Sequence, residues 1–196
     1  MSRWNKRAEK VSSPYERNKL RNAGLIPSYA KRTELTMVDP LLSLSIRTVS
    51  LIALLLWFPV VASFRFAPGR LWAEYVGIFF HLAVFLLVFK LPAPEWARAA
   101  GYSWLLLDVA AGTLRINQVQ PAIAQHVRLG GHIFAGIWIV MASLQGSLAA
   151  KLAGLPAGAI LFAYTFASPF LPTVWLSPAS ILVLAWFAIL AWQNGI

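Results

Sequence analysis

The chain has 196 residues, of which 59% are hydrophobic and 12% are charged, and its mean hydropathy is +0.65. A soluble domain carries about twice that share of charged residues, so the composition is that of a polytopic membrane protein. The sequence has no cysteine, which excludes disulfides, thiolate metal ligands and cysteine nucleophiles.

The first 47 residues form a basic, polar tail that holds ten of the seventeen basic residues of the chain. No apolar run follows these basic residues at once, so we do not expect the tail to be a cleavable signal peptide. We expect the stretch 1–40 to be a solvated tail or to contact anionic lipid headgroups or a protein partner. We do not expect it to bind a nucleic acid, because aromatic residues are not interleaved with the basic ones at a regular spacing.

Six apolar segments follow the tail, and each is near the length that a helix needs to cross a bilayer of about 30 Å. They cover residues 48–64, 71–89, 99–116, 128–149, 154–171 and 178–194. The sequence therefore predicts an all-α fold, a polytopic bundle of about six transmembrane helices over residues 48–196, with the basic tail 1–47 as a separate region.

The basic residues outside the apolar segments predict the orientation of the chain. With the N-terminus inside, thirteen basic residues lie on the inner side and four on the outer side. The positive-inside rule then places both termini in the cytoplasm. Trp72 and Trp175 are expected at the outer membrane interface, and Trp96 and Trp192 at the inner one, as an aromatic belt requires.

The third apolar segment holds a single acid, Asp108, in the run SWLLLDVAAGTLR. Asp108 lies about 14 Å into the segment, close to the membrane midplane, where a carboxylate costs a few kcal/mol unless it is paired or protonated. Its helical face also carries Gly101, Trp104, Gly112 and Arg115. Small residues beside the acid let another helix approach closely, so we expect Asp108 to face the protein interior.

Two histidines occupy related positions on the neighbouring segments. His81 lies near the midplane of the second segment, with Gly77 one turn and Glu74 two turns before it. His132 follows Arg128 by one turn on the fourth segment, at the head of a stripe of small residues. If the three polar faces converge, they form one ligand- or proton-binding cluster, whose predicted members are Glu74, His81, Asp108, Arg115, Arg128 and His132.

A structural interpretation stands beside this functional one for every member of the cluster. Arg115 and Arg128 can extend toward lipid phosphates at the outer interface, as Arg65 and Arg70 can. His81 and Asp108 can form a structural hydrogen bond between helices, which also satisfies a buried polar group.

Three classes of function remain open from the sequence. The first is binding or translocation of a small solute or a proton through the polar cluster, which would open to the outer side. The second is a non-catalytic subunit or assembly partner of a larger membrane complex, or an oligomer, which suits the small size, the packing motifs and the basic tail. The third is a membrane enzyme or redox carrier.

The third class has one concrete form, a b-type haem held by His81 and His132, the one pair of histidines within apolar segments. The estimated depths of the two histidines differ by about 8 Å, which weighs against shared ligation. No phosphate-binding glycine loop, H-E-x-x-H motif or G-x-S-x-G motif is present. We therefore expect no metal site, and an enzyme is the less favoured class.

Overall fold

The computed structural model describes Lys19 and residues 43–193. The predicted basic tail lies almost wholly outside these residues, and so do its expected contacts with lipid or a partner. Every regular element in the described part of the chain is a helix, which confirms the predicted all-α class.

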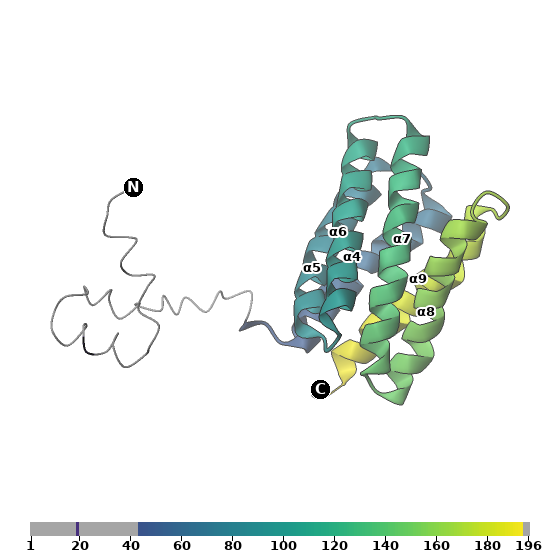
Figure 1. Ribbon diagram of the computed structural model, residues 1–196. Helices are drawn as coiled ribbons and strands as arrows, with labels where there is room; N and C mark the ends of the chain where they lie inside the picture. Colours follow the sequence, from purple (N-terminus) through teal and green to yellow (C-terminus); the bar gives the residue numbers. More distant parts are fainter. Residues whose placement is uncertain (1–18, 20–42, 194–196) are drawn as a thin grey trace. The chain divides into compact units, whose positions relative to one another are not determined.

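Six long helices follow one another through the described residues (Figure 1). They are α4 (Ile46–Phe66), α5 (Leu71–Lys90), α6 (Glu95–Ile116), α7 (Pro121–Leu144), α8 (Leu148–Ala167) and α9 (Ser177–Trp192), the last preceded by the 3₁₀ helix η1 (Thr173–Leu176). Short connections make consecutive helices antiparallel. We call the end that carries connections 67–70, 117–120 and 168–172 the hairpin end, and the other the opposite end.

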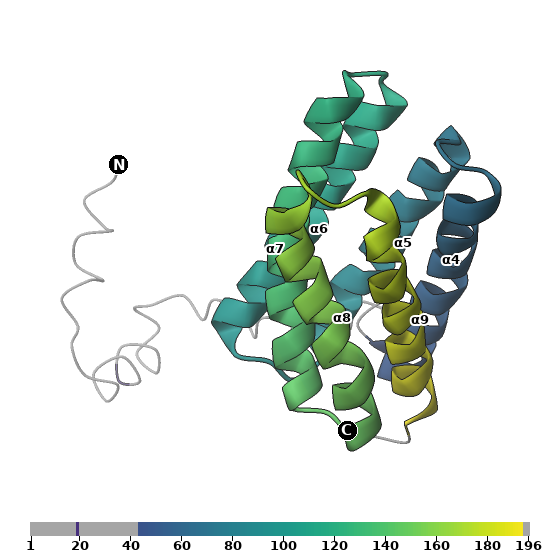
Figure 2. The same cartoon turned by 90° about the vertical axis from the view of Figure 1, so that its right-hand side faces the viewer.

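The six helices close into a ring. Each helix packs against its neighbours in sequence, and α9 packs against both α8 and α4 (Figure 2). The interior contains a closed circuit of six buried aromatic side chains, whose neighbouring ring centroids lie 4.9–5.7 Å apart. The members of this aromatic circuit are Phe80, His81, Trp104, Trp138, Trp186 and Phe187.

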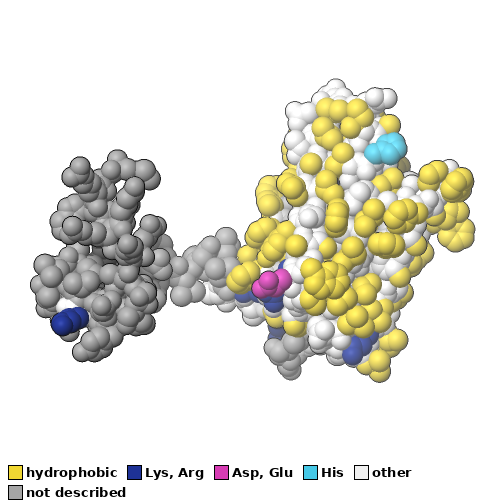
Figure 3. All heavy atoms as spheres, viewed as in Figure 1, with side chains coloured by type: hydrophobic (Ala, Val, Ile, Leu, Met, Phe, Trp, Pro, Cys, Tyr) yellow, Lys and Arg dark blue, Asp and Glu magenta, His cyan; other side chains and the backbone are white. Residues whose placement is uncertain are grey.

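Large apolar side chains cover the outside of the helices, the reverse of the pattern in a soluble protein. Leu55 and Leu106 are each 71% exposed, and hydrophobic side chains cover much of the face seen in Figure 3. Five helical segments are long and apolar enough to cross a membrane, namely α4, α5, α7, α8 and Thr173–Trp192. The chain is therefore a multi-pass membrane protein built as a helical bundle.

Helix α6 is not among these five segments, although it is 22 residues long and packs between α5 and α7. It carries four charged side chains, Glu95, Arg98, Asp108 and Arg115. Only Asp108 lies well inside the helix, and it is 5% exposed. Asp108 therefore faces the protein interior, as the small residues on its helical face predict.

The largest difference from the predicted segments is in the fourth helix. Helix α7 begins at Pro121, not at residue 128, because proline suits the first helical position and only residues 117–120 form the connection. His132 therefore lies near the middle of α7 and not near its end. The predicted difference in depth between His81 and His132, which rested on the later start, no longer holds.

Glycines bring α7 and α8 into close contact. A Cβ atom on Gly136 would lie 2.6 Å from the Gly158 carbonyl oxygen, so no side chain fits between the two backbones. The Thr165 hydroxyl also donates a hydrogen bond of 2.9 Å to the Leu129 carbonyl oxygen across this interface. The glycine pair at residues 154 and 158 of α8 therefore packs within the bundle, against α7.

Candidate functional site

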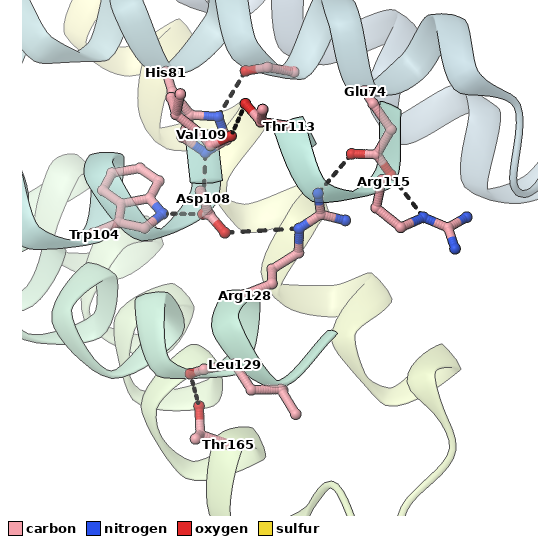
Figure 4. Close-up of polar contacts among 11 residues, drawn as sticks. Glu74, His81, Trp104, Asp108, Val109, Thr113, Arg115, Arg128, Leu129 and Thr165 are labelled. Atoms are coloured by element: carbon pink, nitrogen blue, oxygen red, sulfur yellow. Dashed lines mark hydrogen bonds and ion pairs between the residues drawn. The ribbon is translucent and has the colours of Figure 1, made fainter. Parts of the chain in front are cut away.

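The polar residues of α5, α6 and α7 meet inside the bundle (Figure 4). Helix α5 places Glu74 in its first turn and His81 near its middle. Helix α6 runs antiparallel to it and places Asp108 and then Arg115 toward the same hairpin end. Helix α7 supplies Arg128 from its third turn. The helical spacing of each segment thus sets which of its residues point into one shared site.

Asp108 and His81 form the deepest part of the site. The His81 Nε2 atom lies 3.1 Å from the Asp108 Oδ2 atom. The indole N–H of Trp104, one turn before Asp108 on α6, donates a hydrogen bond to the same oxygen (Figure 4). On the other side of the imidazole, Nδ1 lies 2.6 Å from the Gly77 carbonyl oxygen. Both ring nitrogens of His81 are therefore engaged, which fixes the orientation of the ring.

These contacts define where protons lie in the pair. A carbonyl oxygen only accepts hydrogen bonds, so the Nδ1 atom of His81 carries a proton and donates it to Gly77. The Nε2 atom then faces a carboxylate oxygen, and one further proton must lie between these two acceptors. The pair holds this proton either as imidazolium with carboxylate or as imidazole with carboxylic acid. Asp108 and His81 are therefore joined through one proton in the interior of the bundle.

The second oxygen of Asp108 is buried and has no hydrogen bond in the described part of the structure. The Arg128 Nε atom lies 3.7 Å from it. Gly131 of α7 packs next to this oxygen, since a Cβ atom there would lie 3.4 Å from Oδ1, in ordinary van der Waals contact. The carboxyl group of Asp108 thus keeps one oxygen free to accept a proton or a hydrogen bond.

An ion-pair chain connects Asp108 to the hairpin end. Arg128 donates from Nη2 to the Glu74 Oε2 atom at 2.6 Å, and Arg115 Nε lies 3.6 Å from Glu74 Oε1. The side chains of Arg115 and Arg128 are 28% and 30% exposed, whereas that of Asp108 is 6% exposed. The network therefore runs from a partly accessible rim to a buried carboxyl group.

The structure joins five of the six predicted cluster residues by hydrogen bonds or ion pairs. His132 is the sixth, and it lies within electrostatic range of Asp108 and Arg128. Its Nδ1 atom is buried without a hydrogen bond to any described residue. The link between Arg115 and Asp108 is indirect and passes through Glu74 and Arg128.

Sequence reasoning missed two partners in the site. Trp104 was recognised on the face of Asp108 but not as its hydrogen-bond donor. The Gly77 carbonyl was not recognised as the partner of His81. The signal for both was the four-residue spacing, because residues four apart on a helix lie one above the other.

The polar network ends at the aromatic circuit. Between His81 and Lys90 helix α5 is wholly apolar, and between His132 and the end of α7 no acid, base or further histidine occurs. Trp104, Trp138 and Trp186 are each at most 5% exposed and fill the interior on this side. The acidic and basic groups that connect to the site therefore lie on its hairpin-end side.

Metal and haem ligation do not suit this arrangement. Among the described residues no group of three or more histidine, aspartate or glutamate side chains is placed to hold a metal ion. The predicted haem ligand His81 has Nδ1 donating to Gly77 and Nε2 directed at Asp108, so no ring lone pair is free for iron. A cavity of about 340 Å³ near the start of α7 is lined by His126, Tyr164 and Thr173 among others, and by none of the six cluster residues.

No family model, curated protein or solved structure matches the chain. Its function is therefore inferred from the geometry of the site.

Proposed function

We propose that this membrane protein reversibly binds a proton at the Asp108–His81 pair, and that the proton enters from the hairpin end. The observation that carries the proposal is the 3.1 Å contact between His81 Nε2 and Asp108 Oδ2 in the bundle interior, which requires a proton between the two atoms. An ionisable pair at membrane depth is costly and marks a functional site by default. Here it is also connected to a partly exposed ion-pair chain.

The arrangement favours binding from one side over passage through the bundle. A proton path needs proton-exchanging groups on both sides of the central carboxyl, and the acidic and basic side chains that are ion-paired around Asp108 lie toward the hairpin end. Beyond His81, the aromatic circuit contains no acidic or basic side chain that could continue such a path. A solute that moves with the proton would therefore also bind on the hairpin side of Asp108.

The predicted orientation assigns this side to a compartment. With both termini cytoplasmic, the hairpin end faces the outside of the membrane. Under that assignment the site exchanges protons with the compartment outside the cell or organelle, and the bound proton lies at the midplane of the bundle.

Infrared difference spectroscopy on the full chain in liposomes tests the proposal. Adding a proton to the neutral pair in either of its forms gives imidazolium beside a carboxylic acid. Lowering the pH should therefore raise the carbonyl-stretch band of a protonated carboxylic acid, and Asp108→Asn should remove that band. The matched control is Glu95→Gln, which removes an exposed carboxylate from the same helix and should leave the band in place. An unchanged band in folded Asp108→Asn protein would show that this carboxyl does not exchange its proton and would refute the proposal.

A further inference from the structure

The hairpin-end part of the network carries one more guanidinium group than it has carboxylates. Glu74 is the shared partner of Arg115 and Arg128 and uses both of its oxygens on them. Asp108 is balanced by His81, since the two together with their shared proton are neutral. One positive charge on the two arginines therefore has no counter-charge among the described side chains.

Arg115 has donors to spare. Its one ion pair is the 3.6 Å contact from Nε to Glu74, and its two terminal amino groups make no hydrogen bond to any described residue. A guanidinium group presents its donors as a planar fork that matches a carboxylate or a phosphate. With 28% of its side chain exposed, Arg115 can be reached from outside the bundle.

We infer that Arg115 and Arg128 together bind a small oxyanion, either a carboxylate or a phosphate-type group, and that this binding is coupled to the proton at Asp108. The inference rests on the proposed function and names the class of its ligand. Neutralising an uncompensated charge in a medium of low dielectric constant supplies the driving force. Glu74 holds the two arginines on one site.

The coupling follows from the position of Arg128, whose Nε atom lies 3.7 Å from the free Asp108 oxygen. An anion bound to Arg128 places a negative charge next to the Asp108 carboxyl group. It also offsets the positive charge of Arg128, which otherwise stabilises the ionised form of Asp108. The anion and the proton therefore strengthen each other's binding, and the effect is reciprocal. The ionisable groups that act on Asp108 directly are His81 from α5 and Arg128 and His132 from α7. Glu74 from α5 and Arg115 from α6 are linked to it only through Arg128.

Sulfate is a suitable probe, because its charge does not change over the working pH range. We would measure its binding calorimetrically to the full chain in phosphatidylcholine nanodiscs, at neutral and at mildly acidic pH. Arg115→Gln should weaken binding by about tenfold, the loss of a charge-assisted hydrogen bond. Arg65→Gln is the matched control, because Arg65 lies in the last turn of α4 at the same end and forms no ion pair with a described residue.

Two further arms complete the test. Acidification should tighten sulfate binding to the unaltered chain but not to Asp108→Asn. The same measurement is repeated in nanodiscs that contain phosphatidylglycerol. Weaker sulfate binding there would identify a lipid headgroup as the natural occupant, and unchanged sulfate binding would identify a soluble anion. Both results support the anion site. Arg115→Lys, which keeps the charge without the fork, replaces Arg115→Gln if the latter does not fold, and should show a smaller loss.

The inference is overturned if Arg115→Gln and Arg65→Gln change sulfate binding equally, since the anion would then respond only to the general charge of this end. Binding that depends on Arg115 but not on pH would overturn the coupling. A failure of the proposed function looks different, because the infrared band of Asp108 would then not titrate at all, with or without sulfate.

Discussion

The two halves of α5, α6 and α7 are held together by different interactions. Toward the hairpin end the helices are joined by ion pairs and hydrogen bonds that converge on Asp108 and Glu74. Toward the opposite end they are joined by aromatic rings and by close approach, as where Gly101 would place a Cβ atom 2.9 Å from the Trp138 ring. The boundary between the halves lies at His81 and Trp104, which belong to both.

This contrast shows what each half is suited to do. Apolar contacts in a membrane are no better than contacts with lipid, so the aromatic half depends on shape and close packing. The polar half depends on every buried group having its partner, and one missing partner leaves an uncompensated charge. The first arrangement closes the bundle, and the second forms a site whose charge state can change.

The largest effect is expected from Asp108→Leu, which removes the acceptor of His81 and Trp104 and the counter-charge of Arg128. Breaking a buried pair in this way should lower the free energy of unfolding by about 3–5 kcal/mol. Denaturant unfolding in detergent micelles measures it. Leu106→Ala, at a position 71% exposed on the same helix, is the control. Equal losses in the two variants would mean that the polar half is not held by Asp108.

Gly136→Ala tests the close-packed part of the bundle. Its new methyl group meets the Gly158 carbonyl oxygen at 2.6 Å, and a backbone atom cannot move aside as a side chain can. We expect a loss of about 1–3 kcal/mol. Gly130→Ala on the same helix meets its nearest atom at 3.8 Å and should be nearly neutral in thermal unfolding. A neutral Gly136→Ala would contradict the close contact between α7 and α8.

Trp104→Phe separates the two roles of Trp104, which packs in the aromatic circuit and donates a hydrogen bond to Asp108. Phenylalanine keeps an aromatic ring beside His81 and Trp138 but removes the N–H that donates to Asp108. The expected loss is about 1 kcal/mol, typical of one hydrogen bond. Trp192→Phe, at a position 71% exposed, should cost less, and the opposite order would argue against a hydrogen bond from Trp104.

The smallest effect on stability is expected from Arg115→Gln. Its contact with Glu74 is 3.6 Å long and partly exposed, so it should contribute less than about 1 kcal/mol. The melting temperature in detergent should therefore stay close to that of Arg65→Gln. A large drop would assign Arg115 a structural role and weaken its assignment to anion binding.

Much of this site could be predicted because helical periodicity places residues reliably on one face. Asp108 with Gly112 and Arg115, and His81 with Gly77 and Glu74, were each predicted to share a face from their spacing alone. Composition likewise predicted the membrane class, which the apolar exterior and the five long apolar helices confirm.

The features of the site and fold that could not be predicted depend on how each helix is rotated about its axis and which helices pack together. The ion pair between Glu74 and Arg128 joins residues 54 positions apart on two helices that both flank α6. The start of α7 at Pro121 was hidden by a polar run that belongs to the helix and not to its connection. Helix α9 packs against α4 and so completes the aromatic circuit, but the spacing of residues within either helix does not indicate this contact.

One-sided acidification tests the central claim most directly, that Asp108 is reached from the hairpin end and closed off by the aromatic circuit. The chain has no cysteine, so a single Ser168→Cys in the connection between α8 and η1 reports its orientation in liposomes by labelling. Stopped-flow tryptophan fluorescence is then recorded for this protein and for the same protein with Trp104→Phe. The difference between the two signals reports on the Trp104 indole, which is hydrogen-bonded to Asp108. We predict a rapid response to acid on the hairpin side and none to acid on the opposite side. An equally rapid response from both sides would contradict the account.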